Sequence, residues 1–359
     1  MNIQHKYLVN SLLTKTSYFG SMLAAKQGSY TRHKYFLPTA QYIVDKFDGP
    51  IRVLEIGSWA GASAVSWVKA FVELGCDVQV DCVDHWLPYL DLEQDAGGHY
   101  KKMNSSALSG DIYRLFIHNI ESEGIQNHIK IFRDSSEKIL PELSLSSYNL
   151  IYIDGSHSYK NVLSDIKNAK KLILPGGVIC GDDLELQAGE INQDILTNTV
   201  LDEADIAMHQ DLCYHPGVTL AVDGEFGPVQ SWEGYWGAVW NGQEKEDLKL
   251  CLDELKVPVH LNFIDGDYKI LSESNDVGDI LRNTFYLQGD EVILMHQNVC
   301  GFNIIFYKNI YYAAPQDLGE INFHNVPTHQ LPLILFDEEF GELIKKIIKS
   351  TMSSYLHHL

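Results

Sequence analysis

Residues 149–157, NLIYIDGSH, and residues 177–183, GVICGDD, are two apolar runs that each end in acids. Both runs are apolar at consecutive positions, which is typical of parallel strands covered by helices on both faces. Neighbouring strands lie about 4.8 Å apart, and the carboxyl ends of parallel strands meet at one edge of the sheet. The sequence therefore predicts that Asp154, Asp182 and Asp183 lie close together.

Three gathered carboxylates repel one another, so this edge of the sheet needs a compensating feature. A proton, a cationic partner or a hard divalent metal such as Mg²⁺ would hold them together. Acids that end strands are also common as helix caps, and Asp182 and Asp183 are open to that interpretation. We favour a metal.

The chain around these runs alternates between strand and helix patterns. Strands are expected at residues 52–56, 78–84, 129–132, 149–154 and 177–182, with helical patterns between them. Such alternation predicts an α/β fold with a doubly wound, Rossmann-like parallel sheet. Pro175, Gly176 and Gly177 punctuate the end of the last helix before the fifth strand.

A glycine-rich turn, GSWAGAS at residues 57–63, follows the first strand and opens a helix. In such sheets the ligand binds in the crevice at this point. A dinucleotide fingerprint requires a glycine where this chain has Trp59, and no P-loop is present. A cofactor without phosphates needs only close approach of the backbone at Gly57.

Four further residues at or just after strand ends bear on the cofactor. Asp84 can accept hydrogen bonds from both hydroxyls of a ribose, although a surface acid at a strand end is the plain alternative. Asp134 and Ser135 would flank an adenine edge, or Ser135 would cap a helix. His85 either lines the cleft or is a bystander.

Bulk composition excludes some classes of partner. The formal charge of −21 argues against nucleic acid and anionic membranes, which both need basic surface. No apolar run approaches the roughly 20 residues of a membrane helix. The six cysteines form no CxxC pair, which indicates reduced thiols and a cytoplasmic protein.

The chain is too long for one core, so we expect three parts. These are an N-terminal helical cover (1–48), an α/β domain (49–241) and a small C-terminal α+β module of unknown role (242–359). In the last part, Phe302–Tyr307 and Ile310–Ala314 predict a hairpin around Lys308 and Asn309, and 338–349 predict an amphipathic helix. Aromatic strands of this kind form a core or a subunit interface, which leaves a homo-oligomer open.

Residues 53–63, Asp84 and the run LPGGV at 174–178 resemble the class I S-adenosylmethionine (SAM)-dependent methyltransferases. The resemblance spans roughly residues 35–240. It implies a seven-stranded sheet, a helix over residues 215–223 and closing antiparallel strands within residues 232–240. It also implies that SAM is bound by the following residues: Glu55, Gly57, Ser58, Trp59, Gly61, Ser63, Asp84, His85, Asp134, Ser135 and Asp154.

Within that class, the run IDGSHSY at 153–159 together with GDD at 181–183 is similar to the metal-dependent sugar O-methyltransferases that tailor macrolide and aminocoumarin antibiotics. The resemblance implies that Asp154, Asp182 and Asp183 bind Mg²⁺. It also implies that His157 acts in catalysis beside Asp154, as the base that takes the proton of a sugar hydroxyl. A histidine in such a loop is as often a hydrogen-bonding anchor.

The expected function is therefore Mg²⁺-dependent methylation of a hydroxyl on a sugar-containing small molecule or glycan precursor. Three alternatives stay open. One is a metal-independent SAM methyltransferase acting on another oxygen or a nitrogen. Another is a non-catalytic protein that binds carbohydrate or a partner on the same scaffold. A nucleotide-dependent oxidoreductase is the least favoured, because Trp59 occupies a glycine position of its loop.

Overall fold

The computed structural model of the protein describes residues 7–8, 11–12, 14–26, 30–88, 100–264, 293–299, 302–307, 310–315, 333–337 and 340–356. The chain divides into two compact units. The larger one comprises Thr14–Trp86 and Leu115–Tyr268, and the other comprises Met1–Leu13, Leu87–Arg114 and Lys269–Leu359. The division into parts at residues 48 and 241, drawn from the sequence, stays a prediction.

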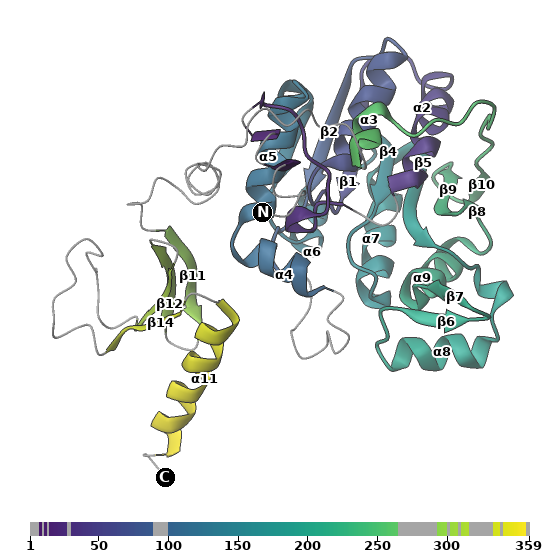
Figure 1. The fold of residues 1–359 in the computed structure, drawn as a ribbon. Helices are drawn as coiled ribbons and strands as arrows, with labels where there is room; N and C mark the ends of the chain where they lie inside the picture. Colours follow the sequence, from purple (N-terminus) through teal and green to yellow (C-terminus); the bar gives the residue numbers. More distant parts are fainter. Residues whose placement is uncertain are drawn as a thin grey trace. The chain divides into compact units, whose positions relative to one another are not determined.

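The larger unit is built on a mostly parallel sheet, which confirms the predicted fold class (Figure 1). Its parallel strands stand in the order β3-β2-β1-β4-β5. Their bounds are β1 Ile51–Ile56, β2 Val78–Val83, β3 Ile129–Phe132, β4 Tyr148–Ile153 and β5 Ile173–Leu184. Strands β1, β4 and most of β5 are buried along their length, as apolar strands in a covered parallel sheet should be.

An antiparallel end completes the sheet beyond β5. Strand β9 (Gly234–Trp240) pairs with β5 along one edge. Its other edge is shared by two short strands, β8 (Gln230–Trp232) opposite residues 235–237 and β10 (Lys245–Asp247) opposite residues 238–240. Eight strands therefore fill seven positions across the sheet, in agreement with the seven that the resemblance implies.

The helices that connect the strands occupy the predicted segments. They are α2 (Phe36–Val44), α3 (Ala62–Glu73), α5 (Asp111–Ser122), α6 (Ser136–Ile139), α7 (Tyr159–Leu172) and α9 (Pro216–Phe226). Helix α9 begins with Pro216 at its first position, where the missing N–H of proline costs no hydrogen bond. Helix α7 packs its apolar face, Val162, Ile166 and Ala169, into the core under the sheet. None of the described helices is both long and apolar enough to cross a membrane.

One insertion between β5 and α9 was not anticipated from the sequence. It contains the short turn η5 (Ala188–Glu190), helix α8 (Gln193–Leu201) and a hairpin of β6 (Ala207–His209) and β7 (Leu212–Tyr214). Asn192 caps α8 by accepting the N–H groups of Asp194 and Ile195. A small core of its own, around Leu196 and Tyr214, holds the insertion together.

The smaller unit contains a four-stranded antiparallel sheet in the order β11-β12-β13-β14. Its strands are β11 (Ile293–Val299), β12 (Phe302–Tyr307), β13 (Ile310–Pro315) and β14 (Leu335–Asp337), and helix α11 (Phe340–Leu356) packs on it. The pairing of Tyr307 with Ile310 confirms the predicted hairpin, whose turn residues 308 and 309 lie outside the described residues. The same unit includes α4 (Lys101–Leu108).

A buried polar cluster in the larger unit joins the N-terminal segment to α3. His33 on the short helix η2 (Tyr30–Tyr35) lies with Nδ1 2.7 Å from Ser66 Oγ, and Ser66 Oγ lies 3.1 Å from His260 Nε2. Burial lowers the pKa of His33 to about 3 and that of His260 to about 4. Both imidazoles are therefore buried in the neutral form at neutral pH.

We expect this cluster to make the protein sensitive to acid. An unfolded histidine takes up a proton below about pH 6.5, whereas folded His33 resists protonation down to about pH 3. The stability contributed by neutral His33 is thus complete above about pH 6.5 and is lost as the pH falls towards 3. Between pH 7 and pH 5 the wild type should lose about 2 kcal/mol more than His33→Asn.

Urea unfolding of both proteins at pH 7 and pH 5 measures this difference. Burial raises the pKa of Glu55 and of Asp165 to about 7, so these acids also titrate in this range, but in the opposite sense. They are present in both proteins and cancel in the comparison. Equal losses of stability in wild type and His33→Asn would contradict a neutral buried His33.

Candidate active site

The turn after β1 approaches the end of β4 so closely that it requires glycine. Gly57 has φ +92°, and a Cβ at this position would lie 2.0 Å from the carbonyl oxygen of Asp154. The N–H of Gly57 donates to Val83 at the end of β2, with a distance of 2.9 Å. The close approach anticipated from the sequence is therefore present, and it joins the ends of three neighbouring strands.

Trp59 adopts the conformation that a glycine would favour, with φ +43°. Its N–H donates to Asp84 Oδ2 at 2.9 Å, and its indole N–H donates to the carbonyl of Ala24 at 2.8 Å. The N–H of Trp86 donates to Asp84 Oδ1 at 2.7 Å, and the indole of Trp86 donates to the carbonyl of Trp59. Asp84 thus joins the glycine-rich turn to the end of β2.

Several predicted cofactor residues lie beneath the turn. Glu55, Ser58 and Ser63 are fully buried, and Ser58 Oγ donates to Glu55 Oε2 at 2.6 Å. Burial raises the pKa of Glu55 to about 7, against the hydrogen bonds from Ser58 and Cys82. Gly61, with φ +86°, starts α3. As placed, Glu55 supports the turn from inside the core.

The other predicted cofactor residues stand around the turn. Asp134 is half-buried and pairs with Lys138 at 3.0 Å. Ser135 precedes α6 with no capping hydrogen bond from its side chain, so the alternative role as a cap is not seen. His85 and Asp84 are half-buried. Burial raises the pKa of Asp84, opposed by the N–H groups of Trp86 and Trp59.

These residues fit a nucleoside cofactor without phosphates. The evidence is the close backbone approach at Gly57 and a half-buried carboxylate, Asp84, at the end of the next strand. In this arrangement Asp84 would hold a ribose, and the turn from Gly57 to Gly61 would face the rest of the cofactor. The individual cofactor contacts stay predictions.

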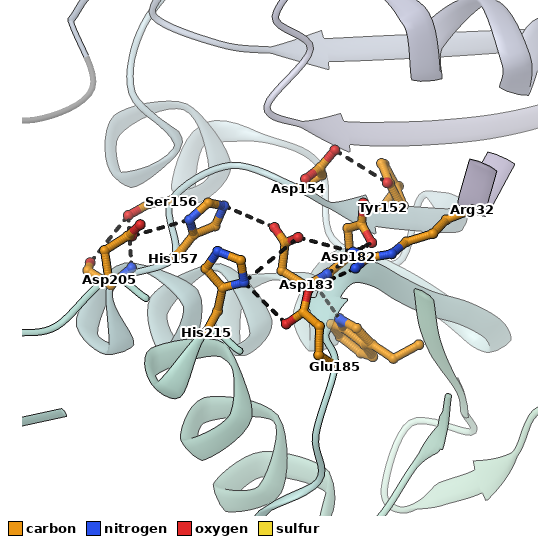
Figure 2. A network of polar contacts seen from close by, with 12 residues as sticks. Arg32, Tyr152, Asp154, Ser156, His157, Asp182, Asp183, Glu185, Asp205 and His215 are labelled. Carbon is orange, nitrogen blue, oxygen red and sulfur yellow. Dashed lines mark hydrogen bonds and ion pairs between the residues drawn. The ribbon is translucent and has the colours of Figure 1, made fainter. Parts of the chain in front are cut away.

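The three predicted acids do come together at the ends of β4 and β5 (Figure 2). Ile153 pairs with Gly181, so Asp154 and Asp182 follow at the same edge of the sheet. Burial, and then the charges of Asp182 and Asp183, raise the pKa of Asp154 well above its usual range. Asp183 has φ +65°, a left-handed conformation that aspartate tolerates better than most residues.

Arg32 is the cation in this cluster, and the sequence offered no signal for it. Its Nη1 is ion-paired with Asp182 and lies 3.1 Å from Asp183 Oδ1, and its Nη2 lies 2.8 Å from Glu185 Oε1. Burial alone would lower the pKa of Arg32, but these carboxylates raise it above its usual value. The cationic partner, one of the compensations considered from the sequence, is therefore present.

Two histidines lie on the other side of Asp183. His157 has Nε2 2.9 Å from Asp183 Oδ2 and Nδ1 3.2 Å from Asp205 Oδ1. His215, the residue that precedes α9, has Nδ1 3.2 Å from Glu185 Oε2, and its ring centre lies 4.2 Å from that of His157. Burial raises the pKa of Asp183, but the charge and hydrogen bond of His157 outweigh it and hold that pKa well below its usual range.

As arranged, these residues do not fit Mg²⁺. Asp182 and Asp183 are already paired with Arg32, whereas Mg²⁺ requires oxygen ligands in near-octahedral geometry. Among the described residues, the group whose ligand atoms lie within 4.8 Å of one another is His157, Asp183 and His215. Two of its three ligand atoms are nitrogens, which Mg²⁺ binds poorly, and its carboxylate, Asp183, is also paired with Arg32. The predicted role of the three acids as Mg²⁺ ligands stays a prediction.

Comparison with known proteins found one family model and several solved structures that are similar to the chain. Residues 54–184 match the family model described as a methyltransferase domain. Among solved structures, the chain is similar to a cofactor-bound protein from MTB, with 18% identity, TM-score 0.37 and coverage of 67% of this chain and 91% of that one. For the O-methyltransferase from Bacillus cereus in complex with SAH, the identity is 15%, the TM-score 0.33 and the coverage 66% and 89%. For the O-methyltransferase NovP, the identity is 15%, the TM-score 0.35 and the coverage 52% of this chain and 79% of that one. No curated protein matches the chain significantly.

Proposed function

We propose that the protein is a SAM-dependent methyltransferase that methylates a hydroxyl of a sugar-containing small molecule or glycan precursor; the match of residues 54–184 to a methyltransferase domain supports this. When bound, SAM supplies the methyl group as an electrophile and is left as S-adenosylhomocysteine (SAH). The methyl group forms a bond to the acceptor oxygen as its bond to sulfur breaks. A neutral hydroxyl must also lose its proton, so an oxygen acceptor needs a base.

The pair of contacts that holds His157 carries this proposal. Asp205 lies beside Nδ1, so Nδ1–H can donate to it, and Nε2 can accept a proton once it gives up its contact with Asp183. Nε2 faces the carboxylate cluster, 2.9 Å from Asp183 Oδ2. An acceptor hydroxyl that takes the place of Asp183 as the partner of Nε2 would transfer its proton to His157 as the methyl group arrives.

A polyhydroxylated acceptor suits the groups around His157. Glu185, Asp205 and His215 are half-buried and offer hydrogen-bond acceptors and donors close to the base. Carboxylates and imidazoles of this kind bind vicinal hydroxyls through short, directional hydrogen bonds. This supports a sugar over an apolar acceptor.

Free cysteines among the described residues support the cytoplasm as the place of reaction.

The sequence also predicts that Mg²⁺ assists the reaction. Since Arg32 already pairs with two of the three carboxylates that would bind the ion, we propose the metal-independent form, in which the chain's own residues position the acceptor. With radiolabelled SAM and a panel of glycosides and nucleotide sugars, we expect label in an O-methyl ether. The rate should be the same with Mg²⁺ and with EDTA.

Matched deoxy analogues of any accepted sugar serve as controls, because they lack the methylated hydroxyl and should remain unlabelled. Loss of activity in EDTA and its return with Mg²⁺ would restore the metal mechanism. Labelling only of amines would indicate a nitrogen methyltransferase. A protein that binds SAM but labels no acceptor would leave the non-catalytic binding protein as the better hypothesis.

A further inference from the structure

We infer that Arg32 permanently occupies the cation position of the carboxylate cluster and stands there in place of a divalent metal. The inference deepens the proposed function, on which it rests, by assigning Arg32 as the residue that positions the acceptor site. Its guanidinium contacts Asp182, Asp183 and Glu185, which are acids on β5 and directly after it. One planar, permanently charged group thus bridges three carboxylates.

The sheet is shaped to receive this side chain. Gly234, the first residue of β9, pairs with Leu184 of β5. A Cβ at Gly234 would lie 2.4 Å from Arg32 Cζ and 2.5 Å from Nη2, so a larger residue there would displace the guanidinium. Only 14% of the Arg32 side chain is exposed. A slot in the backbone and a buried ion-pair network both favour a resident group over a transient contact.

The contacts of Arg32 extend to both histidines through the acids. Asp183 joins Arg32 to His157, and Glu185 joins Arg32 to His215. Removal of the arginine would leave these acids without their cation and release the groups that orient His157. Arg32 is therefore a positioning residue, since it acts on the base through Asp183.

A divalent ion and the guanidinium exclude one another at this position. Both are positive, and both would use Asp182 and Asp183 at a few ångströms' separation, where repulsion is strong inside a protein. The wild type should therefore bind no divalent ion at the cluster. Arg32→Ala should create a site, because the acids that remain are a good set of oxygen ligands.

Mn²⁺ is the probe of choice, because it accepts both carboxylate and imidazole ligands and is visible by electron paramagnetic resonance. We expect wild type to bind no Mn²⁺ up to about 1 mM, and Arg32→Ala to bind one ion about a hundredfold more tightly or better. Adding Asp182→Asn to Arg32→Ala should remove the site. Arg52→Ala is the matched control, since Arg52 pairs with Asp81 towards the opposite end of β1 and should behave as wild type.

One Mn²⁺ bound by wild type as tightly as by Arg32→Ala would overturn the inference, and so would the absence of binding by both. Thermal melts of the wild type are a second test, and they do not depend on whether a variant folds. Its Tm should be the same in Mn²⁺ and in EDTA, and a rise of about 2 °C or more in Mn²⁺ would overturn the inference. Neither the Mn²⁺ binding measurement nor the thermal melt uses SAM or an acceptor. A protein that behaves as expected here but transfers no methyl group would refute the proposed function alone.

Discussion

Asp84→Ala is expected to lose SAH binding, with affinity lower by about a hundredfold or more. Asp84 ends β2, is half-buried, and holds the glycine-rich turn by accepting the N–H groups of Trp59 and Trp86. Two ribose hydroxyls bound to a carboxylate would each contribute about 1.5–3 kcal/mol, because hydrogen bonds to charged groups are the stronger ones. Isothermal titration of both proteins with SAH measures the loss.

Two further variants separate cofactor contact from general damage. Asp77→Ala removes an exposed acid that precedes the same strand, β2, at its opposite end, and it should bind SAH as wild type does. Near-ultraviolet circular dichroism reports on Trp59 and Trp86 and shows whether Asp84→Ala keeps the turn intact. Wild-type affinity in Asp84→Ala would remove Asp84 from the cofactor site and with it the main support for the predicted SAM geometry.

His157→Gln is expected to lower kcat by about a thousandfold, within the usual range for loss of a general base, and to leave the KM for SAM unchanged. Glutamine can keep a hydrogen bond to Asp205 through its amide but cannot take a proton from an acceptor hydroxyl. Steady-state rates on the acceptor found in the glycoside panel, measured across pH 6 to 9, test this expectation.

Asp205, the partner of His157 Nδ1, should also affect the rate. Asp205→Asn should lower kcat by a smaller factor, because it weakens the preference for the hydrogen on Nδ1 without removing the base. His128→Gln is a matched control, since His128 contacts the carbonyl of Val78 near the amino end of the sheet. A kcat of His157→Gln within a factor of about two of wild type would show that His157 is a hydrogen-bonding anchor.

The strands of the methyltransferase domain were predictable because each is decided by its own residues. Runs such as 149–153 are apolar on both sides, and the runs end in Gly57, Asp84, Asp154 or Asp182, which mark the carboxyl edge of the sheet. The insertion with α8, β6 and β7 was not predicted. Its apolar residues show no helical or strand periodicity over a long stretch. Its core of Leu196 and Tyr214 forms only when the segment folds on itself.

Part of the candidate site was likewise predictable from the sequence, and part was not. The sequence by itself determined that Asp154, Asp182, Asp183 and His157 meet, since parallel strands bring their carboxyl ends to one edge. Only the tertiary structure decided which cation balances them. Arg32 is 150 residues from Asp182 along the chain, and nothing local marks it, because an ion pair depends on where two segments pack and leaves no periodic pattern in either.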